Sequence, residues 1–163
     1  MDLLKPLILA AATFAAAPAL AHVAVQPTEA RAGSYQVLRF GVGHGCDGAA
    51  TTAVRIEIPE GISAARPQPK PGWALDIRKE GERVTSITWA GRLPADQFEE
   101  FVMLVKLPGE GERLAFPAIQ SCGAAVLRWT EPVPAAGPRP ARPAPILTLT
   151  PASPPPEGGH DRH

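Results

Sequence analysis

Among the residues of this sequence, His22 is the strongest candidate for chemistry, because a possible cleavage site directly precedes it. Ala19-Leu20-Ala21 has the small-x-small pattern that ends a secretory signal peptide, so cleavage after Ala21 would make His22 the first residue. An amino-terminal histidine offers a metal ion its α-amine and its Nδ1 in one unstrained chelate ring. An α-amine titrates close to neutral pH, so it loses its proton at little cost. Two nitrogen donors in one plane suit Cu(II), which also heads the divalent affinity order.

Residues 1–21 have the organisation of a secretory signal peptide. Lys5 supplies a positive charge, and residues 7–17 form an uncharged apolar run. A membrane anchor is the alternative, but the uncharged stretch 6–21 has 16 residues, fewer than the roughly 20 that span a bilayer. We therefore expect a periplasmic or secreted protein with no membrane span after cleavage. The simplest alternative for His22 is an arbitrary polar residue that happens to follow the cleavage site.

Cys46 and Cys122 are the two cysteines of the chain, and in an exported protein an even pair predicts a disulfide. The bridge would close a loop of about 75 residues, which contributes roughly 4 kcal/mol in the chain-entropy estimate. A two-thiolate metal site is the alternative, although the spacing lacks the CxxC pattern of such sites.

Composition and motifs exclude several classes of function. The 16 Lys and Arg residues balance 16 Asp and Glu residues, so charge gives no reason to expect a nucleic-acid partner. The sequence has no nucleophile elbow, phosphate loop, HExxH motif or Rossmann glycine pattern, which disfavours an enzyme. His44 beside Cys46 is either a second metal ligand or a surface loop histidine. His160 and His163 lie near the end of the chain, where we expect no preorganised geometry.

Short alternating strands between turns must position these residues. The predicted strands are 22–26, 35–42, 52–58, 73–78, 83–89, 100–107, 113–120, 125–130 and 145–150. Period-2 alternation at spacings of about 8–12 residues predicts an all-β fold, an immunoglobulin-like antiparallel β-sandwich. Residues 66–72 contain three prolines and cannot form a central strand. One domain over 22–150 is expected, followed by a disordered Pro-rich C-terminal tail over 151–163.

Several segments, taken together, resemble the YcnI-like copper-binding domain family, formerly a domain of unknown function. They are HVAVQPTEARAGSY (22–35), HGCDG (44–48), TTAVRIEIPEG (51–61), PQPKPGW (67–73), ITWAGRLP (87–94), FEEF (98–101), FPAIQSC (116–122), LRWTEP (127–132) and PAPILTLT (143–150). The resemblance implies a secreted β-sandwich that binds one Cu(II) per chain. It also implies that the copper is held by the α-amine and imidazole of the mature amino-terminal histidine, an arrangement called a monohistidine brace.

By the same resemblance, His22 is the brace histidine and Trp129, in LRWTE, is the tryptophan near copper. An indole has no good lone pair for a metal, so its expected roles are a cation–π contact and tuning of the Cu(II)/Cu(I) balance. A core tryptophan is the alternative for Trp129. The expected carboxylate ligand is Glu100, in FEEF, with Glu57 and Glu60 as rivals.

The resemblance therefore implies a copper-binding protein, and we expect it to have no catalysis of its own. It would capture Cu(II) and pass it to a copper importer, a chaperone or a cuproenzyme. Two alternatives stay open. One is a copper-dependent oxidative enzyme, since the brace resembles half of the two-histidine site of copper oxygenases. The other is a metal-free structural or adhesion-type β-sandwich.

Overall fold

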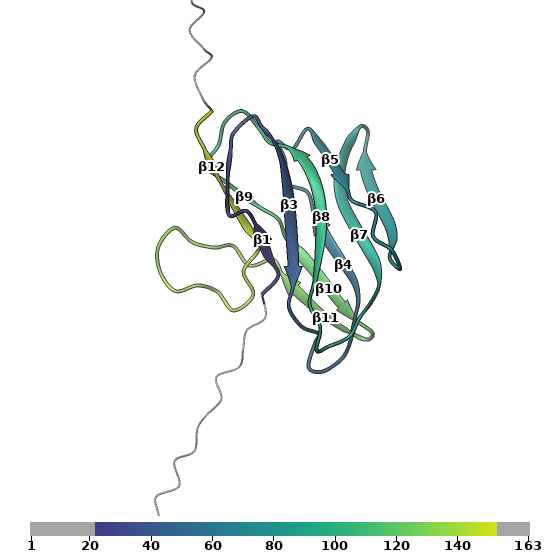
Figure 1. Ribbon diagram of the computed structural model, residues 1–163. Helices are drawn as coiled ribbons and strands as arrows, with labels where there is room; N and C mark the ends of the chain where they lie inside the picture. Colours follow the sequence, from purple (N-terminus) through teal and green to yellow (C-terminus); the bar gives the residue numbers. More distant parts are fainter. Residues whose placement is uncertain (1–21, 153–163) are drawn as a thin grey trace, which may run out of the picture.

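A computed structural model describes residues 22–152, which form a β-sandwich (Figure 1). The expected signal peptide 1–21, and the expected tail beyond residue 152, lie outside the described residues. The strands are β1 (Ala24–Gln26), β2 (Glu29–Arg31), β3 (Tyr35–Val42), β4 (Thr51–Glu57), β5 (Ala64–Pro67), β6 (Ala74–Glu80), β7 (Arg83–Leu93), β8 (Glu99–Lys106), β9 (Arg113–Ala115), β10 (Ala118–Cys122), β11 (Ala125–Trp129) and β12 (Ile146–Thr150). Residues 22–152 contain no helix that could cross a bilayer.

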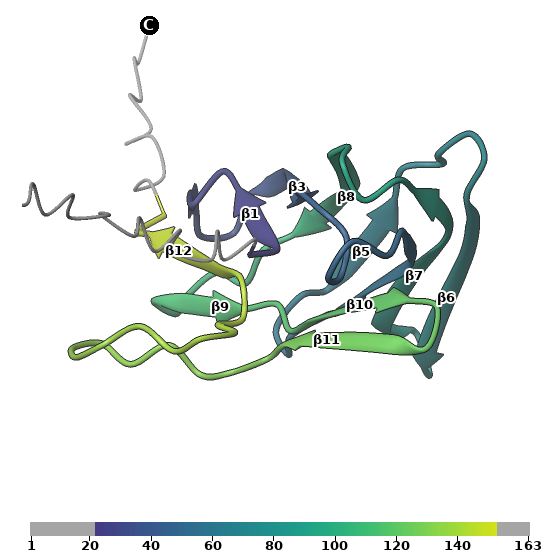
Figure 2. The same cartoon turned by 90° about the horizontal axis from the view of Figure 1, so that it is seen from below.

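Two sheets form the layers of the sandwich. One has the strand order β1-β3-β8-β5 and the other β11-β10-β4-β7-β6, and neighbouring strands in both are antiparallel. Figure 2 shows the layers nearly edge-on, with β3 and β8 in one and β10 and β11 in the other. The predicted all-β, immunoglobulin-like sandwich is therefore confirmed.

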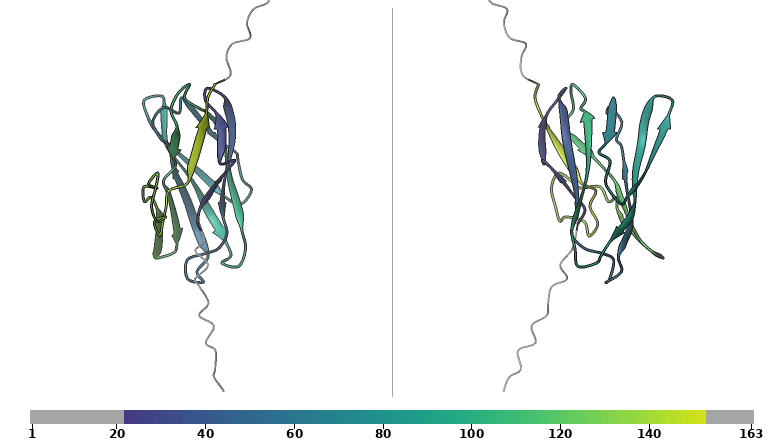
Figure 3. Two further views of the ribbon diagram at one scale, coloured as in Figure 1. Left: turned by 90° about the vertical axis from the view of Figure 1, so that its left-hand side faces the viewer. Right: turned by 45° about the vertical axis from the view of Figure 1, so that its right-hand side comes forward.

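A third, small sheet has the order β2-β12-β9 and lies beside β1. The left-hand view of Figure 3 shows β12 next to the first strands of the chain. In this sheet β12 pairs with β9 antiparallel but with β2 parallel. The parallel pair is an addition to the antiparallel pattern predicted from the sequence.

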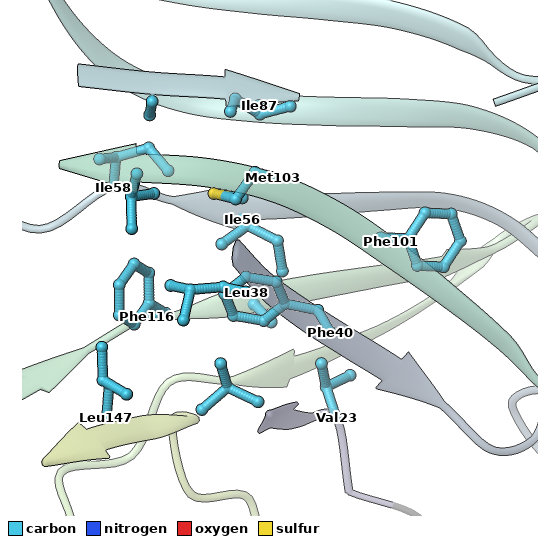
Figure 4. Packing of buried hydrophobic residues seen from close by; sticks show 14 of the residues in the cluster. Val23, Leu38, Phe40, Ile56, Ile58, Ile87, Phe101, Met103, Phe116 and Leu147 are labelled. Carbon is cyan, nitrogen blue, oxygen red and sulfur yellow. The ribbon is translucent and has the colours of Figure 1, made fainter. Parts of the chain in front are cut away.

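The core lies between the two large sheets and follows the alternation of the strands. In β3 the inward side chains are Leu38, Phe40 and Val42, and β8 contributes Phe101 and Met103 from the neighbouring strand. Figure 4 shows Leu38, Phe40 and Met103 gathered around Ile56 of the opposite sheet, with Leu147 of β12 at the margin of the same cluster. Burying a side chain of this size contributes about 1.5–3 kcal/mol, so these strands hold the layers together.

The structure corrects the predicted strands at three places. The predicted strand 113–120 is wrong as one element, because residues 116–117 belong to no strand and the two halves, β9 and β10, join different sheets. Proline has no amide hydrogen for a strand ladder, which favours a break at this position. The short strands β2 and β5 were not predicted. β5 is an edge strand and ends at Pro67, consistent with the prediction that residues 66–72 form no central strand.

Candidate metal centre

His22 and Trp129 meet where the two sheets meet at one side of the sandwich. His22 comes just before β1 and Trp129 ends β11, and these are edge strands of the opposing sheets. Their ring centroids are 5.6 Å apart and the ring planes are tilted by 48°. Two of the three predicted site residues, far apart in the sequence, are therefore brought into contact.

The strand register explains how His22 reaches this position. Val23 and Val25 are buried, while Ala24 pairs with Gly41 of β3. Two buried valines so close to the first residue of the domain fix β1 against the core. His22 is consequently held at the end of this edge strand, half-buried, rather than extending away from the fold.

Trp129 is 4% exposed and belongs to the hydrophobic core. The core-tryptophan alternative is therefore correct, and the same ring also contacts His22. Its indole Nε1–H donates a hydrogen bond to Oε1 of Gln120 at 3.3 Å. Because that hydrogen is used inside the protein, the indole can act on a bound ion only through its ring.

A buried polar chain continues behind Trp129. The Gln120 Nε2 donates to Oγ1 of Thr51 and to the main-chain oxygen of His44, both at 2.8 Å. Gln120 is 2% exposed and Thr51 is fully buried. Sequence analysis missed this chain. The available signal was a polar glutamine at the inward position of a strand, between the buried residues Ala118 and Cys122.

Cys46 and Cys122 form a disulfide, with their Cα atoms 5.9 Å apart. The predicted bridge is confirmed, and the two-thiolate metal site is excluded because both cysteines of the chain are used. Oγ1 of Thr51 lies 3.8 Å from Sγ of Cys122, so the bridge adjoins the polar chain. Gly45 allows the tight turn before Cys46, since a Cβ there would collide with the main-chain oxygen of Ala49.

The other histidines have different outcomes. His44 is half-buried, and its Nδ1 lies 2.6 Å from the main-chain oxygen of Gly45. Its own main-chain oxygen accepts the Gln120 hydrogen bond. His44 is therefore part of the turn that supports the polar chain, rather than a loosely exposed loop residue. His160 and His163 lie outside the described residues.

Glu100 lies away from the pair formed by His22 and Trp129. In register it faces Gly41 of β3, which in turn faces Ala24 of β1. Two strand spacings, roughly 9–10 Å, thus separate its backbone from β1. The Glu100 carboxylate is 3.9 Å from Nε of Arg39, and both side chains are about half exposed. The structure brings together His22 and Trp129 but leaves the predicted carboxylate two strands away.

Two of the other acidic residues have ion-pair partners of their own. Glu57 forms an ion pair with Arg55, and Glu60 is exposed in the turn after β4. Glu99, next to Glu100, lies 2.7 Å from Nζ of Lys70. Burial alone would raise the pKa of the Glu99 carboxyl. The hydrogen bonds from Lys70 and from the Glu100 amide, together with the Lys70 charge, outweigh burial and hold this pKa below its ordinary value.

The side chains of residues 22–152 do not form a complete metal site by themselves. No group of three or more His, Cys, Asp or Glu side chains in this part of the chain is arranged to hold an ion. An ion held by the His22 imidazole would therefore need other donors as well. The α-amine that cleavage after Ala21 would create fits this requirement in chemistry, since amine and imidazole nitrogens both suit Cu(II).

Comparison with known proteins now identifies the class. Residues 22–149 match the family described as "Domain of unknown function (DUF1775)", and the chain belongs to this family. The resemblance predicted from the sequence is thereby confirmed.

Two relatives give this class a context. The chain is 31% identical over 131 residues to the copper-binding protein CutI of Bacillus subtilis (strain 168), covering 78% of this chain and 64% of CutI. It thus spans somewhat less than two thirds of that relative. It is also similar to a Nocardia farcinica protein whose crystal structure is described as an immunoglobulin-like fold. The TM-score is 0.71 and the identity 35%, over 81% of this chain and 99% of the other.

Proposed function

We propose that this protein binds one Cu(II) ion at His22 for copper trafficking or homeostasis, and that it has no catalysis of its own. The observation that carries the proposal is the contact between His22 and Trp129, with ring centroids 5.6 Å apart, at the edge of the sandwich. The similarity to CutI, which is named a copper-binding protein, supports the choice of metal.

In this proposal the α-amine and the Nδ1 of His22 hold the ion. Trp129 lies against the imidazole and acts through its π-face, because its Nε1–H is given to Gln120. A ring face attracts a cation and excludes water on that side. The remaining positions on the ion stay accessible, which permits transfer to a copper importer, a chaperone or a cuproenzyme.

A carboxylate ligand is a separate part of the proposal. Glu100 is half exposed, and an ion pair of that kind contributes only about 0–1 kcal/mol, so exchange of Arg39 for copper costs little. The amino-terminal residue would have to reach across β3 to meet Glu100. Glu57 and Glu60 are the rivals, and their replacement by Gln serves as the matched comparison.

Export is also proposed, with cleavage after Ala21 and a periplasmic or secreted location. The disulfide supports export, because disulfides persist in oxidising compartments. The intact mass of the secreted protein tests both points. It should correspond to a chain that starts at His22 and lacks the two thiol hydrogens. A mass that includes Ala21 would contradict the brace.

The decisive experiment compares protein that begins at His22 with protein carrying one extra amino-terminal Gly. The extension removes the His22 α-amine but leaves the imidazole and the fold. We expect it to weaken Cu(II) binding strongly and to change the EPR spectrum, and His22→Ala to abolish the site. Asp76→Asn, on the exposed strand β6 at the opposite edge, is the control and should bind copper normally. Equal affinity and identical spectra for the extended protein would refute the brace.

The two alternative functions predict different results in the same preparation. An oxidative enzyme would consume a substrate when supplied with ascorbate or peroxide and copper. A metal-free structural protein would bind no Cu(II) even when it begins at His22. Substrate turnover would therefore replace the trafficking proposal, and absence of binding would remove it.

A further inference from the structure

We propose that Gln120 is a positioning residue that holds the Trp129 indole against His22. The proposal rests on the copper function proposed above, and it assigns to the buried polar chain a role at that site.

The hydrogen bonds of Gln120 fix the direction of its amide. A glutamine amide has two donor hydrogens and one acceptor oxygen. Both donors are used, one on the main-chain oxygen of His44 and one on Oγ1 of Thr51, each at 2.8 Å. A flipped amide would set two oxygens against each other at His44. Oε1 must therefore point at the indole Nε1–H, 3.3 Å away.

Burial makes these bonds difficult to replace. Gln120, Thr51 and Trp129 are all 4% exposed or less, so water does not compete for their polar atoms. Buried donors that lose their acceptor are costly, and buried indoles accordingly keep a partner for their N–H. If Gln120 could not accept this bond, the indole N–H would be buried without an acceptor. Rotation of the indole toward another acceptor would then lower the free energy, and the ring would move away from the imidazole of His22.

The other end of the polar chain is anchored covalently. Thr51 lies 3.8 Å from Sγ of Cys122, and His44 is two residues before Cys46 in the same disulfide-tied turn. Gln120 thus connects Trp129 to a turn that the disulfide holds in place. Residues that orient the groups around a metal commonly affect its affinity without touching it.

The test uses protein that begins at His22, with Gln120→Leu and Gln120→Glu. The leucine removes all three hydrogen bonds. The glutamate keeps an acceptor oxygen for the indole but cannot supply both amide donors. Thr52→Val is the matched control. Thr52 neighbours Thr51. Its Oγ1 donates to the main-chain oxygen of Ser121 in β10 and accepts from the amide of Gly123 just after β10, but these bonds do not lead to Trp129.

Two measurements separate positioning from general stability. The first is the NOE between the Trp129 indole and the His22 ring in the metal-free protein. The second is the Cu(II) affinity together with the EPR spectrum. We expect Gln120→Leu to lose the NOE, to change the spectrum and to bind Cu(II) about 10–100-fold more weakly. Gln120→Glu should lie between Gln120→Leu and wild type, and Thr52→Val should match wild type.

Several results would overturn the proposal. One is a Gln120→Leu protein that keeps the NOE, or that loses it and still binds Cu(II) with the wild-type affinity and spectrum. If Gln120→Leu does not fold, Gln120→Glu decides the question. An unchanged NOE and an unchanged EPR spectrum in Gln120→Glu would also overturn the proposal. If wild type binds no Cu(II), the proposed function fails, while the NOE alone still decides whether Gln120 positions Trp129.

Discussion

The two edges of the sandwich, β1 with β11 and β5 with β6, differ in the side chains that they present and in what supports those side chains. On one side, β1 and β11 bring His22 against Trp129, and a buried amide, a hydroxyl and a disulfide support the indole. On the other side, β5 and β6 border a groove of about 460 Å³. The right-hand view of Figure 3 shows β6 standing at the outer edge of its sheet.

The β5–β6 side exposes apolar surface along its edge strand. Every residue of β6 is exposed, and Leu75 and Ile77 face the groove with 37% and 43% of their surface accessible. Exposed apolar side chains are common on soluble proteins, whereas buried polar side chains are less common and are held by hydrogen bonds. The comparison teaches that the hydrogen bonds behind a residue, rather than its exposure, distinguish the side where we propose that copper binds.

The largest effect should come from removing the covalent support of the β1–β11 side. The Cys46→Ala/Cys122→Ala double variant should lose about 4 kcal/mol of unfolding free energy, because the denatured chain regains the freedom of a long loop. Denaturant unfolding of the purified protein measures the loss. Reduction of wild type should reproduce it. A loss below about 1 kcal/mol would show that this side does not depend on the bridge.

Trp129→Phe and Ile77→Ala compare the two sides directly. The phenylalanine leaves Oε1 of Gln120 without its donor and leaves a small cavity, so we expect a loss of about 2 kcal/mol. Ile77→Ala should cost about 0.5 kcal/mol or less, as is usual for surface positions. Thermal or denaturant unfolding gives both values. Equal losses would break the distinction between the two sides.

Glu100→Gln tests a carboxylate whose ion pair with Arg39 is solvent-exposed. Stability of the metal-free protein should change by less than about 1 kcal/mol. The Cu(II) affinity should fall and the EPR spectrum should shift if Glu100 is a ligand. Glu57→Gln and Glu60→Gln are the comparisons, and an effect in either of them without one in Glu100→Gln would reassign the ligand.

The smallest effect concerns the ion pair between Lys70 and Glu99, the first residue of β8. Since the pKa of Glu99 is lowered in the folded protein, its ionised carboxylate stabilises the fold above the unfolded pKa, and this contribution is lost as pH falls through the folded value. Lys70→Met should therefore raise the pKa of Glu99 and flatten the acid dependence of stability. NMR titration of Glu99 measures the change. An unchanged pKa would mean that Lys70 is not its cause.

The sequence was sufficient for the layers but not for the contacts between them. Alternation in 35–42 and 100–107 identified strands whose inward residues form the core. Cys46 and Cys122 could pair in only one way. The break at Pro117 and the short strands β2 and β5 were not evident, because partner choice in a sheet depends on residues distant in the chain.

The site was predictable to the same extent. Resemblance pointed to His22 and Trp129, and the structure adds that their rings touch. Gln120 was not predicted, because a single polar residue in a strand indicates a buried hydrogen-bond network only when its side chain is known to point inward. The predicted position of Glu100 beside His22 depended on register, which places Gly41 and its strand between β8 and β1.

The parallel pairing of β2 with β12 has a consequence for how the molecule is completed. Glu29 and Thr148 are register partners although nearly the whole domain separates them in the chain. The chain is synthesised from its amino end, so β2 has no strand to pair with until β12 has been made. Contacts of such long sequence separation slow folding. The small sheet beside β1 is therefore completed only when the last strand of the domain is available.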